Sequence, residues 1–189
     1  FHSTSIESFT IPPHLTKICK GAFSDCSKLK YIEFLPDSKL QTIEANAFTF
    51  SKIESFYIPS SLYELNEGWC HGTNKLAKIS ISEDNSIYCL LNNKIVIGKS
   101  SIDAEYYDEL VFCSREAKSV VIPNYIKKIR DGAFFCCKKL KTIEFDSESQ
   151  LQTIGEYAFS QSSIKKFSLS PQVTKIGESA FYRCENLKI

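Results

Sequence analysis

The sequence lacks methionine and has little histidine, with three residues of that type among 189, and it has no long apolar run. A membrane-spanning helix needs roughly 20 consecutive apolar residues, so no membrane insertion is expected in this segment. Positive charge is not in excess either, because 23 Lys and Arg stand against 22 Asp and Glu and the net charge is +1. Nucleic-acid binders need a basic surface to neutralise phosphates, so nucleic acid is not an expected partner. The N-terminal residues 1–4 show no initiator Met and no basic-then-apolar signal, so location cannot be inferred from a targeting signal.

Sequence motifs for metal binding and catalysis are also missing. The chain has no Cys-x-x-Cys or His-x-x-x-His pair, and the neighbours Cys70-His71 and Cys136-Cys137 would diverge on extended backbone. No Gly-x-Gly-x-x-Gly or Walker loop occurs, and the three histidines form no recognisable nucleophile–base arrangement. We therefore expect no metal, no cofactor and no enzymatic activity. The absence of an Asn-x-Ser/Thr sequon is mildly informative for a chain proposed to face the outside.

A short repeat runs through almost the whole chain. An opening pattern, apolar-x-x-apolar-x-apolar, starts at Ile6 and returns after steps of 23, 24 and 23 residues, and it does so again from Ala117. A second apolar signature follows most openings, as in Leu15-Thr-Lys-Ile18 followed by Gly21-Ala22-Phe23. A longer period of 111 residues carries residues 6–78 onto residues 117–189, which indicates duplication of a block of turns.

One period of this length cannot bury its own apolar face, so the repeat predicts a solenoid in which each turn is covered by its neighbours. The last two apolar positions of each opening are two apart, which is the strand period, so the openings are predicted to stack as a curved parallel sheet. The Leu-Thr-Lys-Ile stretch predicts a second short extended segment. The segment Gly-Ala-Phe-x-x-Cys predicts a short helical turn on the other side. The predicted class is a β-dominated α/β solenoid of 23–24-residue turns.

The predicted organisation is a single array over residues 1–189 with one irregular part. Regular turns occupy residues 6–81, an irregular turn with a hairpin excursion occupies 82–116, and the duplicated regular turns occupy 117–189. The hairpin is expected at residues 88–97, because Asn92 and Asn93 tolerate the positive φ of a two-residue turn. Such an excursion is either an accessory binding surface or a spacer between the duplicated blocks.

Eight cysteines raise the question of disulfides. The repeat puts Cys26, Cys137 and Cys184 at one inward position, whose counterparts in the following or intervening turns are Ser51 and Ser162. These three cysteines are then too far apart for bridges, so we expect buried free thiols that act as small apolar residues. Cys89 and Cys113, both in the irregular part, are the one pair that could bond. The surplus of thiols weakly favours a reducing setting.

The strand positions between the core residues predict the exposed face of the sheet. This face is mixed in charge, with tyrosine in its first half and lysine further along. Tyrosine gives a large contact area at low entropic cost, which suits recognition of proteins. An exposed sheet must be polar in any case, so that requirement alone could explain these residues. The candidate partner-binding residues on this face are Tyr31, Glu33, Tyr57, Lys78, Thr142, Glu144 and Lys166.

The run Ile-Pro-x-x-Leu/Val-Thr-x-Ile-Gly-x-x-Ala-Phe-x-x-Cys-x-x-Leu-x-x-Ile, seen over residues 11–32 and 169–187, resembles the BspA-like leucine-rich repeats. The resemblance covers nearly the whole chain. It implies a curved, non-enzymatic solenoid, often outside the cell, that takes part in adhesion to host proteins or to other microbes. It supplies no residue-level binding motif. The chain departs from the pattern at Trp69-Cys70, which takes the Ala-Phe position, and at Ser170-Pro171.

These observations favour a cell-surface or extracellular repeat domain that binds proteins or glycans, such as host matrix or other cell-surface molecules, through its strand-lined face. An intracellular, cytoplasmic interaction scaffold of the same fold is the alternative, and a repeat appendage on an enzyme outside these residues is a third. Polar caps are missing at both ends, so we expect a fragment of a longer array or end-to-end self-association.

Overall fold

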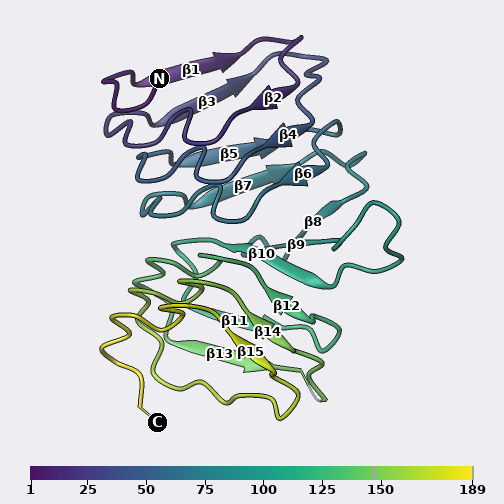
Figure 1. Ribbon diagram of the computed structural model, residues 1–189, viewed down its shortest axis with the longest axis vertical. Helices are drawn as coiled ribbons and strands as arrows, with labels where there is room; N and C mark the ends of the chain where they lie inside the picture. Colours follow the sequence, from purple (N-terminus) through teal and green to yellow (C-terminus); the bar gives the residue numbers. More distant parts are fainter. Residues whose placement is uncertain (147, 189) are drawn as a thin grey trace. The chain divides into compact units, whose positions relative to one another are not determined.

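A computed structural model describes residues 1–146 and 148–188, and the chain forms two compact units (Figure 1). Unit 1 is Phe1–Leu90 and unit 2 is Leu91–Ile189. Each unit is a stack of β-solenoid turns with parallel sheets, which confirms the predicted solenoid.

Unit 1 contains two columns of parallel strands. The first column consists of β1 (Ser8–Ile11), β3 (Tyr31–Phe34), β5 (Ser55–Ile58) and β7 (Lys78–Ile81). β1 pairs in register with β3 and β5 with β7, so that equivalent repeat positions lie side by side. The second column consists of the short strands β2 (Lys17–Ile18), β4 (Thr42–Ile43) and β6 (Glu64–Leu65), also parallel and in register. The repeat period therefore sets the register directly.

The core of unit 1 follows the predicted alternation of inward and outward residues. Ile11, Phe56 and Ile58 are buried, while the residues between them on the strands are exposed. The Phe23 and Phe48 rings stack at 5.2 Å between centroids, and Trp69 continues this aromatic column edge-on against Phe48 at 6.2 Å. The core therefore accommodates the departure from the Ala-Phe pattern at Trp69, because the indole ring packs where a phenylalanine ring packs in other turns.

The Gly-Ala-Phe-x-x-Cys segments are not helical, and that part of the prediction is wrong. No residue in the described ranges is helical. Phe23 N donates to Ala47 O at 2.7 Å and Asp25 N donates to Thr49 O at 2.8 Å, both across to the neighbouring turn, while Ser24 N bonds locally to Gly21 O. A helix would need all of these N–H groups for local bonds, so the lateral bonds replace it with a ladder of turns.

Unit 2 has the same two columns with a different beginning. β9 (Ile95–Gly98) and β10 (Glu109–Cys113) pair antiparallel, and β10 continues in parallel into the short strands β12 (Lys128–Ile129), β14 (Thr153–Ile154) and β15 (Lys175–Ile176). The other column contains β11 (Ser119–Ile122) and β13 (Thr142–Phe145), which pair in parallel. β8 (Tyr88–Leu91) precedes β9, and Asn92 and Asn93 between them have φ of 51° and 53°, as a tight two-residue turn requires.

Two features of the structure differ from simple repetition. Residues 164–169 were predicted to form a further strand, but they do not form one. Ser170 follows this segment, where a proline follows β5 and β11. The last predicted strand begins at Leu187 and includes Ile189, which lies outside the described residues.

In unit 1, buried Asn85 closes the stack of turns. Its Nδ2 donates to Pro59 O and Leu62 O at 2.7 and 2.8 Å, and its Oδ1 accepts from Ile87 N and Tyr88 N.

Candidate functional site: the strand-lined faces

The strand-lined face of unit 1 carries the tyrosines that the sequence singled out. Tyr31 on β3 is 50% exposed and Tyr57 on β5 is 38% exposed, while Ile32 and Phe56 beside them face the core. Glu33 and Lys78 are exposed on the same column of strands. The alternation of inward and outward residues is what places all four side chains on one face.

Local contacts hold part of this face in place. Thr10 Oγ1 donates to Glu33 Oε2 at 3.3 Å across the β1–β3 pair. The Tyr57 ring packs edge-on against Phe34 at 5.7 Å between centroids, so one side of the ring is anchored and the other faces solvent. An anchored aromatic ring beside a carboxylate can make both apolar contacts and hydrogen bonds with a partner.

The corresponding face of unit 2 has a different composition. Thr142 and Glu144 are exposed on β13 and lie opposite Ser119 and Val121 of β11. Val121 contributes an exposed apolar side chain where unit 1 has a polar one. Lys166 is also exposed, but it lies within residues 164–169, which do not form a strand.

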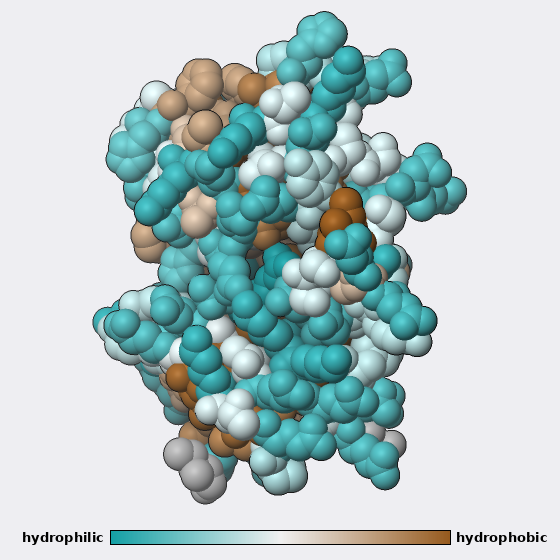
Figure 2. All heavy atoms as spheres, turned by 45° about the vertical axis from the view of Figure 1, so that its right-hand side comes forward, coloured by the Kyte–Doolittle hydropathy of each residue, from teal (hydrophilic) through white to brown (hydrophobic). Residues whose placement is uncertain are grey.

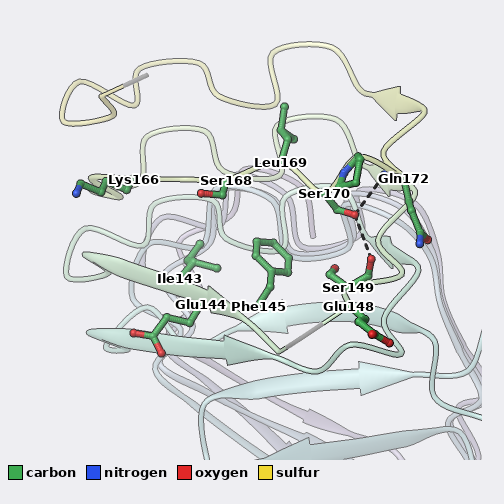
Figure 3. Close-up of a pocket in the computed structure, with 11 residues that line it drawn as sticks. Ile143, Glu144, Phe145, Glu148, Ser149, Lys166, Ser168, Leu169, Ser170 and Gln172 are labelled. Atoms are coloured by element: carbon green, nitrogen blue, oxygen red, sulfur yellow. Dashed lines mark hydrogen bonds between the residues drawn. The ribbon is translucent and has the colours of Figure 1, made fainter.

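A cavity opens in this face between β13 and the segment 166–172 (Figure 3). Within the described residues β13 pairs with β11 alone. The Phe167 ring of the segment packs edge-on against Phe145 of β13 at 5.5 Å between centroids, and hydrogen bonds hold the segment near its two ends. Lys165 N donates to Lys141 O at 3.2 Å at one end, and Ser170 Oγ donates to Ser149 O at 3.1 Å at the other. Between these two hydrogen bonds the described segment forms no strand pairing with β13, and a cavity of about 730 Å³ lies there.

The cavity combines charged and apolar side chains. It brings together Glu144 and Lys166, two of the residues predicted from sequence, and adds Glu148, which the sequence did not indicate. Figure 3 shows the side chains of Ile143 and Phe145 on β13, between Glu144 and Glu148. Leu169 on the opposite wall is 51% exposed. Such a lining offers carboxylates and hydroxyls for hydrogen bonds beside an apolar floor.

Charges on the short-strand column are paired within the chain instead. Lys17 Nζ lies 2.5 Å from Glu44 Oε1, and this hydrogen bond raises the pKa of Lys17 and lowers the pKa of Glu44. In unit 2, Glu109 accepts from Arg130 Nε at 2.5 Å and lies 3.7 Å from Lys128 Nζ. These pairs make the short-strand columns less suited to binding a charged partner than the strand-lined faces.

The excursion of unit 2 presents further exposed side chains. Asp108 accepts from Ser100 N at 2.9 Å and from Ser100 Oγ at 3.0 Å, which closes the base of the loop between them. Ile102 and Tyr106 within the loop are each 67% exposed. The face of the molecule drawn in Figure 2 is largely hydrophilic, with apolar side chains in small separate groups.

Neither a metal site nor a membrane-spanning element is found in the described part of the chain. Among residues 1–146 and 148–188, no three or more His, Cys, Asp or Glu side chains gather where they could hold a metal ion. In the same residues no helix has the length and apolar character to cross a bilayer.

Comparison with known proteins places the sequence in a repeat family. The profile described as the BspA type leucine rich repeat region matches residues 1–96 and 105–189, with six copies of the repeat. No curated protein matches the chain significantly.

Three solved bacterial structures share the fold. The pneumococcal vaccine antigen PcpA is 20% identical with a TM-score of 0.78, and a leucine rich cell surface protein from Faecalibacterium prausnitzii is 23% identical with a TM-score of 0.74. A leucine-rich repeat protein from Eubacterium ventriosum is 22% identical with a TM-score of 0.73. Each comparison covers 97% of this chain but only 50%, 52% and 53% of the other chain, so the chain spans about half the length of these structures.

Proposed function

The chain belongs to the BspA-type leucine-rich repeat family, and from that premise we propose that it is a non-enzymatic module of a cell-surface protein that binds other proteins through its strand-lined face. Repeat folds of this kind typically act by surface complementarity, because a rigid stack of turns presents side chains at fixed spacing. Two of the structural relatives are described as a vaccine antigen and a cell surface protein, which supports a surface location for this chain.

The observation that carries the proposal is the exposed pair Tyr31 and Tyr57 with Glu33 on the face of unit 1. Large aromatic side chains on a rigid strand lose little conformational entropy on binding, and such residues are enriched among binding hot spots. Lys78 adds a positive charge on the same column of strands.

The cavity in unit 2 favours a second ligand class, glycans. Its walls carry Glu144, Glu148 and Ser168 near the apolar side chains of Phe145 and Leu169. Sugars present hydroxyls along their edges and C–H groups on their faces, so a mixed lining of carboxylates, hydroxyls and apolar groups suits them.

The binding proposal is tested with a triple variant, Tyr31→Ala, Glu33→Ala and Tyr57→Ala. The purified chain is passed over immobilised extracellular-matrix proteins and a glycan array, and the variant is then compared on whatever binds. We expect at least a tenfold loss of protein binding, since truncating one hot spot typically costs about 2 kcal/mol or more. The matched control is Lys17→Ala, Thr42→Ala and Glu64→Ala, three outward residues on the short-strand column of the same unit. Equal binding by the wild type and the triple variant would refute the role of the unit 1 face.

Location is tested separately by protease shaving of intact cells, followed by mass spectrometry with a cytosolic protein as control. Release of peptides from this chain while the control stays protected supports the surface assignment. Protection of both would favour the alternative, an intracellular interaction scaffold of the same fold.

A further inference from the structure

Charge is distributed unevenly between the two units, although the whole chain has a net charge of +1. Residues 1–90 contain 8 Lys and Arg against 10 Asp and Glu, whereas residues 91–189 contain 15 against 12. Unit 1 is therefore negative by 2 and unit 2 positive by 3. The near-neutral total thus does not exclude an anion-binding surface on unit 2.

One position of the repeat in unit 2 is lysine in four successive turns. It directly follows the first apolar residue of each opening pattern, and we define the lysine row as Lys118, Lys141, Lys165 and Lys188. Lys141 N donates to Lys118 O at 2.9 Å. Lys165 N donates to Lys141 O at 3.2 Å, and Lys188 N donates to Lys165 O at 3.0 Å. All four residues are exposed, so four ammonium groups follow one another along the edge of unit 2 at which β11 and β13 begin (Figure 1).

The fold does not require lysine at this position. The equivalent residues of unit 1 are Glu7, Lys30, Glu54 and Ala77, and the same backbone hydrogen bonds join them, at 2.8, 3.1 and 3.0 Å. The charges at this position therefore alternate in sign in unit 1, whereas they repeat in unit 2. Like charges at directly neighbouring positions repel each other, so the lysine row lowers the stability of unit 2 unless an anion lies beside it.

The chain itself supplies little compensating charge. Within residues 1–146 and 148–188, no acidic side chain forms an ion pair with any ammonium group of the lysine row. Glu116 lies two residues before Lys118, but it pairs with Lys139 instead. Lys138 and Lys166 add two more exposed lysines within three residues of the row. An external anion is therefore the natural partner of this strip.

We propose that the lysine row binds a linear sulfated polysaccharide, which lies across the turns of unit 2 along the row. Neighbouring parallel strands lie about 4.8 Å apart, so the four lysines extend over about 14 Å with one positive charge at each turn. A sulfated polysaccharide carries negative groups on successive sugars of a single chain, so it can meet each ammonium group in turn. Lysine provides a point charge on a long flexible side chain, which adapts to sulfate groups at slightly different spacing.

Other polyanions fit the row less well. An anionic membrane or a nucleic-acid duplex presents a broad negative surface, which would meet the carboxylates of Glu144 and Glu185, both exposed and within three residues of the row. Single-stranded nucleic acid binds where aromatic side chains stack on its bases. The residues that follow the first three lysines of the row are not aromatic, since they are Ser119, Thr142 and Lys166. The row therefore favours a narrow polyanion that needs no stacking.

The test measures binding of the purified chain to a size-fractionated heparin oligosaccharide over a range of salt concentrations. The row is removed by a quadruple variant, Lys118→Gln, Lys141→Gln, Lys165→Gln and Lys188→Gln. We expect it to lose roughly tenfold or more in affinity at physiological salt. The slope of log K against log salt concentration should also become shallower by about 3, since each neutralised contact contributes about 0.7–0.9. Arginine at the same four positions keeps the charge and should keep the binding.

The matched control removes four exposed lysines of unit 1, in Lys28→Gln, Lys30→Gln, Lys39→Gln and Lys75→Gln. It lowers the net charge of the chain by the same amount, so we expect it to bind as the wild type does. An equal loss in both quadruple variants would mean that binding follows total charge, and it would overturn the proposal. So would the absence of wild-type binding at physiological salt.

The ligand class is tested with the same purified chain. Binding to desulfated heparin, to a single-stranded oligonucleotide or to phosphatidylserine vesicles that is as tight as binding to the sulfated oligosaccharide would overturn the assignment. The inference rests on the surface location proposed above but not on the face of unit 1. The variant Tyr31→Ala, Glu33→Ala and Tyr57→Ala should therefore bind the oligosaccharide normally, which distinguishes failure of one site from failure of the other.

Discussion

The amide of Asn85 is predicted to be a main stabilising contact of unit 1, and Asn85→Ala tests this. The side chain is buried and makes four hydrogen bonds to the backbone, two donated to Pro59 O and Leu62 O and two accepted from Ile87 N and Tyr88 N. Tyr88, which Asn85 positions, accepts from Leu65 N through its hydroxyl at 2.8 Å. Asn85 thus fixes the chain that covers the last short strand of unit 1.

The expected cost follows from these bonds. A side-chain hydrogen bond contributes about 0.5–1.5 kcal/mol net, and buried groups that lose their partner cost about 1–3 kcal/mol each. Water can reach some of the freed groups, because residues 84 and 86 beside Asn85 are exposed. We therefore expect a loss of about 3 kcal/mol in the free energy of unfolding of unit 1.

The assay uses the single tryptophan of the chain. Trp69 lies in the core of unit 1 at 3% exposure, so its fluorescence reports on that unit in a urea titration. With an m-value of about 1.5–2 kcal/mol/M for a unit of this size, the midpoint should fall by about 1.5–2 M. The control is Asn74→Ala, the same change at an exposed position of unit 1 whose bond to Lys52 is 3.4 Å long. A fall no larger than that of the control would refute the assignment of these bonds as stabilising.

Four further predictions concern buried cysteines and the packing of glycines. Ser51→Cys should allow a disulfide with Cys26 when the chain refolds in a mixture of reduced and oxidised glutathione, because equivalent inward side chains of successive turns meet, as Ser162 Oγ and Cys184 Sγ do at 3.5 Å. A mass spectrum without this linkage would contradict the contact. Burial raises the pKa of Cys137, but the neighbouring Cys113 and the guanidinium of Arg115 outweigh burial and lower the pKa to about 7. Cys137 is therefore ionised in the folded state between about pH 7 and pH 9 while the unfolded thiol stays protonated, so the reduced wild type should gain stability relative to Cys137→Ser as the pH rises through this range. Urea titrations at several pH values measure this gain, and a stability difference that does not change with pH would contradict it. Gly155→Ala should destabilise unit 2 by about 2 kcal/mol, since a Cβ there would lie 2.4 Å from Asp131 Oδ1 and 2.6 Å from Asp131 N. Gly21→Asn should cost less than about 1 kcal/mol, since φ is +65°, which asparagine tolerates, and a Cβ meets nothing nearer than 3.9 Å. Melting curves of the two glycine variants compare them directly, and a larger loss for Gly21→Asn would contradict this.

The sequence predicted the solenoid and the strands of the first column because burial enforces the repeat there. Ile11, Ile58 and Ile122 occupy equivalent positions and are all fully buried. The helical turn was predicted wrongly because periodicity shows which residues face inward but not whether backbone N–H groups bond locally or across to the next turn. Here Phe23 N and Asp25 N bond across, which only the stacked structure shows.

The closing contacts of Asn85 could not be read from the repeat for a related reason. Asn85 lies in the interval from 82 to 116, where the spacing of the repeat breaks and positions cannot be assigned to turns by counting.

The duplicated blocks show which positions the fold constrains and which it leaves free to vary. Inward residues stay apolar at equivalent positions and are often identical, as at Ile32 and Ile143 or at Phe56 and Phe167, because both blocks must fill a similar core. Outward residues need only be compatible with water. Glu33 and Glu144 are the same, but Tyr31 corresponds to Thr142, and Tyr57 corresponds to Ser168 at the wall of the cavity. The face of unit 1 therefore offers aromatic contact area where the face of unit 2 offers a hollow lined by carboxylates. Because the tyrosines of one face are replaced at the same repeat positions of the other, we expect mutations in the two faces to affect the binding of different molecules.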